Sequence, residues 1–131
     1  MISVDDFRLA GRTLFSFGLV RDTDGNLSVF DGTTITITRT GASLASIDDG
    51  ALVAGTMDDD LPGASTDLQI HRRLYRQRGP GAIVHAHPPG TVPEEAAVAG
   101  EHGTYTFGPS LGEAADTAVR EARSLRGRSA T

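Results

Sequence analysis

The chain has 131 residues, and its 12 basic and 17 acidic side chains give a formal net charge of −5, so we expect one domain that binds neither nucleic acid nor an anionic membrane. It contains no Cys and no Lys, which excludes disulfides, thiolate metal sites, cysteine nucleophiles, Schiff-base catalysis and lysine-dependent phosphate-binding loops. No apolar run of 18 residues and no signal peptide is present, which predicts a soluble cytoplasmic protein with no membrane partner.

The N-terminal segment is expected to be a helix over residues 3–19. Ser3 fits its N-cap, and Gly18 fits its end. Apolar side chains recur along it at spacings of three and four residues, which places them on one face of a helix. This stripe consists of Val4, Phe7, Ala10, Leu14 and Phe17.

Strands are predicted next. Residues 27–30 and 33–38 flank Asp31-Gly32, a dipeptide typical of a two-residue hairpin loop. The second segment alternates, so its two isoleucines should face one side of the sheet and its threonines the other. Residues 51–54 form a short apolar run that predicts another strand.

A second helix is predicted over residues 66–78, capped by Ser65 and ended by Gly79. Ile70 and Leu74 lie four residues apart and are expected to face the core. The solvent-facing side is expected to carry Arg72, Arg73 and Arg76.

The C-terminal part is expected to add two strands and a helix. Residues 82–87 begin as an apolar run, and residues 104–107 form a second strand-like segment. Ser110 and Glu113 have the spacing of a capping box, so a last helix is predicted over about 111–125.

Two histidines, His85 and His87, flank a single residue on the predicted strand 82–87. Side chains two apart on a strand share a face, so both imidazoles should project together, as in a divalent metal site. The candidates for a third ligand are His71 and His102. Three His ligands with an open position would serve to polarise a carbonyl or stabilise an enediolate, whereas ordinary surface or core histidines are the alternative.

Asp67 is expected in the first turn of the helix over 66–78, where a helix N-terminus favours an ionised carboxylate. It is a candidate general base, although a first-turn acidic residue needs no catalytic role. Further residues in turns and at this helix N-terminus could donate hydrogen bonds to an anion, and turn formation is the alternative for each. They are Gly25, Asn26, Thr40, Gly41, Ser65 and Thr66.

Five segments, in the correct order, resemble the class II aldolase/adducin family, represented by fuculose-phosphate aldolase. The most specific is IVHAHPP (83–89), which is similar to the family's VVHTHPP. The others are GLV (18–20) with GNLSV (25–29), resembling GLV…GNLSVR; TITRTG (36–41), resembling ITPSG; STD (65–67) with His71 and Tyr75, resembling SSE…H…Y; and EHG (101–103) with FG (107–108) and LGEA (111–114), resembling NHG…G…LEEA.

The resemblance implies a three-layer αβα fold with a central, mainly antiparallel sheet, as a domain over residues 1–126 followed by a flexible tail at 127–131. It implies a shortened member, because only 14 residues separate His87 from His102, whereas typical relatives have several times that interval. It also implies four-fold homo-oligomers, usually tetramers, with sites at subunit interfaces.

For the site, the resemblance implies that His85, His87 and His102 bind Zn²⁺ or another divalent metal. Asp67 stands where the family has its catalytic Glu, and the six turn and helix-end residues match positions that hold the substrate phosphate. Arg39 replaces the usual Pro and could add an anion contact or point into solvent.

The implied function is that of a metal-dependent, aldolase-type lyase. It would cleave or form a carbon–carbon bond in a small hydroxy-carbonyl or sugar-phosphate substrate through a metal-stabilised enediolate, with Asp67 moving the proton. A related decarboxylase, epimerase or dehydratase would share this chemistry. A non-catalytic, adducin-like interaction module is the alternative from a different functional class.

Overall fold

The computed structural model describes residues 3–21, 23–88 and 103–129 of the chain. One five-stranded sheet has the spatial order β3-β2-β1-β4-β5, and every neighbouring pair of strands is antiparallel. The strands are β1 (Asn26–Phe30), β2 (Thr34–Thr38), β3 (Leu52–Thr56), β4 (Gly81–Ala86) and β5 (Thr104–Gly108). The helices are α1 (Val4–Ser16), α2 (Leu68–Arg78) and α3 (Leu111–Ser129), with two short 3₁₀ turns, η1 (Leu44–Ser46) and η2 (Asp49–Ala51).

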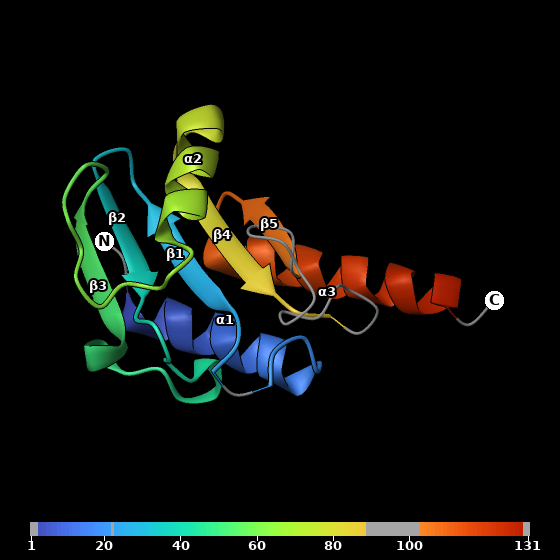
Figure 1. Ribbon diagram of the computed structural model, residues 1–131. Helices are drawn as coiled ribbons and strands as arrows, with labels where there is room; N and C mark the ends of the chain where they lie inside the picture. Colours follow the sequence, from blue (N-terminus) through green and yellow to red (C-terminus); the bar gives the residue numbers. More distant parts are fainter. Residues whose placement is uncertain (1–2, 22, 89–102, 130–131) are drawn as a thin grey trace.

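The helices cover both faces of the sheet, as Figure 1 shows: α1 and α3 lie on one side and α2 lies on the other. The expected three-layer αβα architecture with an antiparallel sheet is therefore confirmed. β4 is buried along its whole length because it lies between β1 and β5 under helices on both faces. None of the described helices is both long enough and apolar enough to cross a membrane.

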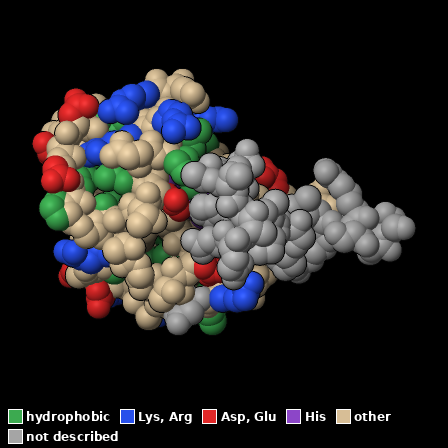
Figure 2. Space-filling model, in the orientation of Figure 1, with side chains coloured by type: hydrophobic (Ala, Val, Ile, Leu, Met, Phe, Trp, Pro, Cys, Tyr) green, Lys and Arg blue, Asp and Glu red, His purple; other side chains and the backbone are tan. Residues whose placement is uncertain are grey.

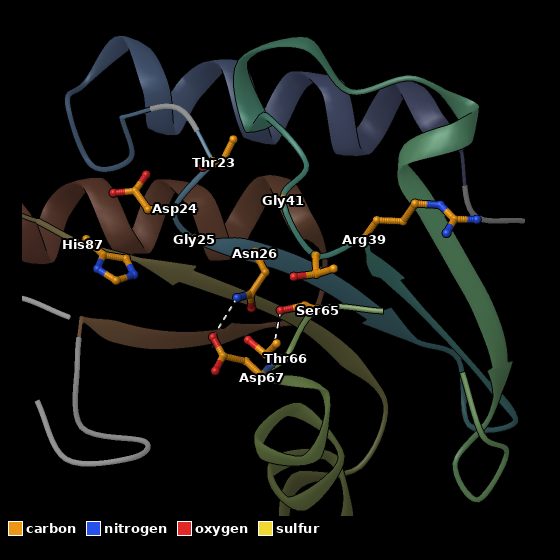
Figure 3. Close-up of a pocket in the computed structure, with 11 residues that line it drawn as sticks. Thr23, Asp24, Gly25, Asn26, Arg39, Gly41, Ser65, Thr66, Asp67 and His87 are labelled. Carbon is orange, nitrogen blue, oxygen red and sulfur yellow. Dashed lines mark hydrogen bonds between the residues drawn. The ribbon is translucent and has the colours of Figure 1, made fainter. Parts of the chain in front are cut away.

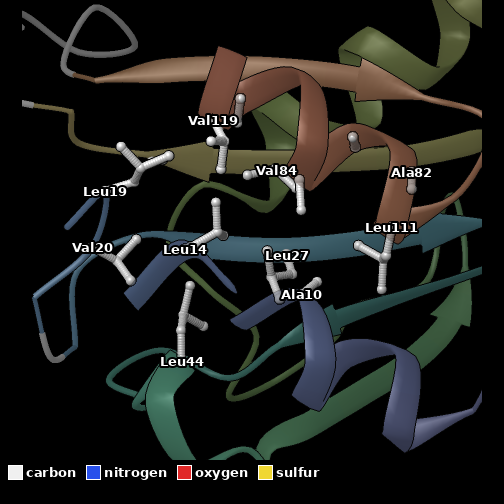
Figure 4. Packing of buried hydrophobic residues seen from close by; sticks show 14 of the residues in the cluster. Ala10, Leu14, Leu19, Val20, Leu27, Leu44, Ala82, Val84, Leu111 and Val119 are labelled. Carbon is white, nitrogen blue, oxygen red and sulfur yellow. The ribbon is translucent and has the colours of Figure 1, made fainter. Parts of the chain in front are cut away.

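The larger apolar core lies between the sheet and the α1/α3 layer (Figure 4). Ser3 caps α1 by accepting a hydrogen bond from the Asp5 backbone N–H at 3.1 Å, as predicted. Most of the predicted stripe is buried, but Phe17 is 42% exposed. The reason is that α1 ends at Ser16, so Phe17 occupies the C-cap and leaves the helical path that buries Leu14.

The β1–β2 hairpin has the predicted two-residue loop, displaced by one residue. Phe30 pairs with Ile35, and the Asp31 N–H donates to the Thr34 carbonyl at 3.2 Å. The loop is therefore Gly32-Thr33, with Gly32 at φ +101°, a left-handed conformation that glycine adopts without strain. The Asp31 carboxylate is used instead to accept the backbone N–H groups of both threonines that follow.

The prediction for α2 was wrong about its start and its buried face. The helix begins at Leu68, and Asp67 rather than Ser65 is its N-cap residue. Its buried face carries Leu68, His71 and Tyr75, while Ile70 and Leu74 are only half-buried. Periodicity alone missed this face because it assumes that the most apolar stripe is the buried one.

Arg72, predicted to be solvent-exposed, is also buried. Its guanidinium Nη2 donates to the backbone carbonyls of Thr56, at 3.1 Å, and of Asp59. These carbonyls lie at the end of β3 and in the turn that follows, so two backbone oxygens partly compensate the charge of the guanidinium. The arginines that follow on α2 are exposed and gather over this helix in the surface view (Figure 2).

The third helix begins as predicted. Ser110 Oγ accepts the Glu113 backbone N–H at 3.2 Å, which is the first half of a capping box. The helix continues to Ser129, beyond the expected end near residue 125. The proposed domain limit at residue 126 stays a prediction.

Candidate active site

One row of side chains crosses the sheet beneath the start of α2. In the strand register Asn26 of β1 is opposite His85 of β4, which is opposite Tyr105 of β5. The side chains of all three lie on the α2 face, since the ring of Tyr105 packs edge-on against His85 at a centroid distance of 4.1 Å and Asn26 contacts His71 of α2. The sheet therefore presents an amide, an imidazole and a phenol side by side.

The two histidines at the end of β4 converge. Their Nε2 atoms lie 3.0 Å apart, His85 being fully buried and His87 half-buried. The His87 backbone N–H donates to the Leu19 carbonyl at 2.8 Å, which holds this residue beyond the strand end. Two imidazoles on one tetrahedral Zn²⁺ have nitrogens separated by about 3.3 Å, given Zn–N bonds of about 2.05 Å. The observed separation is about 0.3 Å shorter and is also that of a hydrogen bond between the two rings, so the pair comes close to the spacing that a shared divalent cation needs.

The third expected ligand, His102, lies outside the described residues. Within the described ranges, no cluster of three His, Cys, Asp or Glu side chains could hold a metal ion. The next residue, Gly103, approaches the histidine pair closely: a Cβ built there would be 3.2 Å from His85 Nε2 and 2.2 Å from the Ala86 carbonyl oxygen. Gly103 has a φ of +69°, and because it lacks a Cβ it leaves space beside His85 that any other residue would fill.

His71, the other candidate for a third ligand, faces elsewhere. Its Nδ1 lies 2.6 Å from Ser28 Oγ, and its Nε2 is hydrogen-bonded to Asn26 Oδ1, so both ring nitrogens are engaged. Complete burial lowers the pKa of His71 to about 3, which keeps the ring neutral. We therefore exclude His71 as the third ligand of a cation held by His85 and His87.

The contacts of His71 were not predicted from the sequence. Ser28 Oγ also lies 2.7 Å from the Tyr75 hydroxyl, and burial raises the pKa of Tyr75 above its usual range. A signal was present, because Ser28 is two residues from Asn26 on a strand and Tyr75 is four residues from His71 on a helix. Each pair shares a face, but the sequence does not say that the two faces meet.

Asp67 lies beside the histidine pair, at the N-cap of α2. Its Oδ2 accepts a hydrogen bond from Asn26 Nδ2 at 2.8 Å and lies 3.7 Å from His85 Nδ1. The backbone N–H of Asp67 donates to Ser65 Oγ at 3.2 Å. Burial, followed by the Asp67 charge, raises the pKa of the Tyr105 phenol, so this neighbour stays protonated at neutral pH.

A polar cavity of about 120 Å³ opens in front of Asp67 and His87 (Figure 3). It gathers all six residues expected to bind an anion, which come from the start of β1, the segment after β2 and the segment before α2. The complete lining is Thr23, Asp24, Gly25, Asn26, Arg39, Thr40, Gly41, Ser65, Thr66, Asp67 and His87. Sequence reasoning did not include Thr23 and Asp24, which lie in a turn whose shape the sequence leaves open.

Arg39 contributes to the cavity lining, but its exposed side chain leads away from the cavity centre. Its Nε donates to the Gly50 carbonyl at 2.7 Å, and a Cβ at Gly63 would approach its guanidinium to 2.5 Å. In Figure 3 the side chain extends away from Asn26 and Asp67. The Arg39 side chain therefore joins the segment after β2 to the 3₁₀ turn η2 and packs against Gly63.

A family model described as "Class II Aldolase and Adducin N-terminal domain" matches residues 6–94. The chain belongs to this family. Within the matched range lie the two convergent histidines, Asp67 and the residues that line the polar cavity.

Relatives of known structure have the same fold. The crystal structure of L-fuculose-1-phosphate aldolase from Thermus thermophilus is 38% identical with a TM-score of 0.61, over 66% of this chain and 45% of that chain. The structure of YgbL from Klebsiella pneumoniae, a putative aldolase/epimerase/decarboxylase, is 20% identical with a TM-score of 0.76, over 93% of this chain and 86% of that chain. At this identity the second likeness concerns the fold alone.

Among curated proteins, a probable bifunctional methylthioribose-1-phosphate isomerase/methylthioribulose-1-phosphate dehydratase from Nocardia farcinica is 34% identical over 84 residues. The match covers 60% of this chain and 15% of that protein. The chain thus spans less than half the length of the first of these aldolases and a small part of the bifunctional enzyme.

Proposed function

We propose that the chain is a divalent-metal-dependent lyase that cleaves or forms a carbon–carbon bond in a small hydroxy-carbonyl or sugar-phosphate substrate. The observation that carries this proposal is the convergence of His85 Nε2 and His87 Nε2, 3.0 Å apart, beside Asp67 and a polar cavity. Family membership supports the same class of chemistry.

We propose that His85, His87 and His102 hold the cation, with Zn²⁺ as the first candidate. For His102 the support is the position of Gly103, the next residue, whose added Cβ would lie 3.2 Å from His85 Nε2. The Asp67 carboxylate lies 3.7 Å from His85 Nδ1. A carboxylate on that side of the ring favours the orientation in which the other nitrogen, Nε2, points to the cation. When bound, such a cation supplies Lewis-acid chemistry at neighbouring carbonyl and hydroxyl oxygens of a substrate.

Asp67 is the proposed proton-transfer residue. Its carboxylate borders the cavity and accepts a hydrogen bond from Asn26 Nδ2, which holds it in place. In the cleavage direction it would accept the proton of the substrate hydroxyl as the adjacent carbon–carbon bond breaks, and in the reverse direction it would return that proton. Because Asp is one methylene shorter than the Glu typical of the family, the substrate must approach α2 more closely for a hydrogen bond to form.

The anion-binding part of the proposal rests on the donors around the cavity. Gly25, Asn26, Thr40, Gly41, Ser65 and Thr66 line it. Gly25 and Gly41 have φ values of +81° and +77°, so the backbone bends there in a way that favours glycine. Backbone N–H groups in such turns, together with hydroxyls, can surround a phosphate without any lysine.

A dehydratase is the second candidate, because the bifunctional relative from Nocardia farcinica has methylthioribulose-1-phosphate dehydratase in its name. The same carboxylate would then take a proton from carbon rather than from oxygen and pass it to the hydroxyl that leaves the neighbouring carbon as water. A decarboxylase or epimerase would use the same residues. A non-catalytic interaction module, the alternative from another class, would need neither the cation nor Asp67.

The test begins with metal content after purification and dialysis, for the wild-type chain, His85→Ala and the exposed helix variant Arg73→Ala. We expect stoichiometric metal in the wild type and in Arg73→Ala, and its loss in His85→Ala. Turnover of L-fuculose 1-phosphate and methylthioribulose 1-phosphate, with and without chelator, then separates lyase from dehydratase. Absence of both metal and turnover would favour the interaction module. The expected homo-oligomer would be checked by sedimentation equilibrium.

A further inference from the structure

A buried hydrogen-bond chain connects α2 and β1 behind the proposed site. Tyr75, Ser28, His71 and Asn26 are all buried, and together they end on Asp67 at the cavity. The heavy-atom distances are 2.7 Å from Tyr75 Oη to Ser28 Oγ, 2.6 Å from Ser28 Oγ to His71 Nδ1 and 2.8 Å from Asn26 Nδ2 to Asp67 Oδ2. His71 Nε2 and Asn26 Oδ1 complete the chain.

The hydrogen-bond chain ends on a carboxylate, and this determines which atom donates in each of its hydrogen bonds. Asn26 Nδ2 donates to Asp67 Oδ2, so the amide turns its nitrogen toward Asp67 and its oxygen toward His71. His71 Nε2 must then donate, and a neutral imidazole carries only one N–H, so Nδ1 accepts.

The remaining donors are then determined as well. Ser28 donates its hydroxyl proton to His71 Nδ1, and Tyr75 donates its own to Ser28 Oγ. Burial lowers the pKa of His71 to about 3 and raises that of Tyr75, so these protonation states hold near neutral pH. All four protons are therefore ordered in one direction, toward the cavity.

From this geometry we infer that His71 is a positioning residue that holds the Asn26 amide with its N–H groups, and not its oxygen, toward Asp67 and the cavity. The Asn26 amide nitrogen has a second N–H, and none of the hydrogen bonds among the described residues uses it. Because Asn26 lines the cavity, that N–H is available to an anionic group of a ligand. A reversed amide would present a carbonyl oxygen and repel the anion.

This inference rests on the proposed function, because the anion that the second Asn26 N–H would bind is the anionic group of the proposed substrate. His71 Nε2 donates to Asn26 Oδ1 from a ring whose other nitrogen is held by Ser28 Oγ, so the amide cannot reverse without losing this hydrogen bond.

The first test is a direct one. Long-range ¹H–¹⁵N correlation spectra of the wild-type chain report which His71 ring nitrogen is protonated. We expect a neutral ring with the proton on Nε2 and none on Nδ1, and the same state in the Tyr75→Phe variant, whose Ser28 hydroxyl can still donate. A ring protonated on Nδ1, or a charged ring at neutral pH, would overturn the inference.

The second test measures binding of inorganic phosphate by calorimetry. His71→Gln keeps a donor near the position of Nε2, whereas His71→Leu has none, so phosphate affinity should stay within about twofold in the first and fall about tenfold in the second, the loss of one hydrogen bond to a charged group. Thr106→Val removes a buried hydroxyl that has no hydrogen-bond partner among the residues that the structure describes, and serves as the stability control. Equal loss in both His71 variants, relative to this control, would overturn the positioning role.

The two proposals can fail separately. Absence of phosphate binding by the wild-type chain would refute the anion site under "Proposed function". The position of the His71 proton would still show whether the hydrogen bonds of the buried chain run in the inferred direction. The spectroscopic test needs no variant, so it also remains decisive if His71→Leu does not fold.

Discussion

Acid should destabilise this fold through His71 in particular, and the size of the effect follows from its burial. The pKa of an unfolded His is near 6.5, and burial lowers the folded-state value to about 3. Between these values the unfolded chain binds one more proton than the folded chain, so the free energy of unfolding falls as the pH falls. The contribution of His71 is fully present above about pH 6.5 and is lost on acidification toward pH 3.

The magnitude is about 1.4 kcal/mol per pH unit over this window, or roughly 5 kcal/mol if the whole window were crossed. That is comparable with the total stability of a small domain, about 5–15 kcal/mol. The surrounding groups do not offset it. Tyr75 and Tyr105 have raised pKa values and stay neutral, and Asp67 is separated from the His71 ring by the Asn26 amide.

Urea unfolding of the wild type and of His71→Gln at about pH 7 and about pH 5 measures this contribution. Between these pH values the free energy of unfolding of the wild type should fall by about 2 kcal/mol more than that of the variant. The reason is that the wild type has an imidazole that is neutral when folded and binds a proton when unfolded, whereas Gln does not titrate. The Thr106→Val control should follow the wild type at both pH values. If the wild type and His71→Gln lost the same free energy on acidification, the reasoning about His71 burial would be refuted.

Urea unfolding also tests a turn glycine, a buried arginine with its exposed neighbour as control, and a helix cap. Gly25→Ala should cost more than about 2 kcal/mol, because φ is +81° and the new Cβ would lie 2.7 Å from the His85 carbonyl oxygen; a loss below about 1 kcal/mol would show that the backbone yields there. Arg72→Met should cost about 1–3 kcal/mol, since the Thr56 and Asp59 carbonyls lose a charged donor. Arg73→Met on the exposed side should stay within about 0.5 kcal/mol, and equal effects would contradict the burial of Arg72. Ser110→Ala should cost about 1 kcal/mol through the lost helix cap, and no change would mean that water replaces this hydroxyl.

Much of the architecture followed from local patterns. The alternation of Ile and Thr in β2, the glycine turn after β1 and the Ser110 cap each depend on a few consecutive residues. Period-two and period-four spacings report which side chains share a face because backbone geometry imposes them. The same reasoning brought His85 and His87 to a common face, where their Nε2 atoms converge.

The amino-acid sequence by itself thus determined the order of the strands and helices and their bounds to within a few residues, the absence of lysine and cysteine chemistry, and the paired histidines. Only the tertiary structure decided that Arg72 is buried, that His71 is no partner of the histidine pair, and that β1 and α2 join in one hydrogen-bond chain ending on Asp67. The physical reason is that a polar side chain can be buried only where distant groups satisfy its hydrogen bonds. Those partners are Ser28 and Asn26 for His71 and the Thr56 and Asp59 carbonyls for Arg72, and no local spacing in the sequence identifies them.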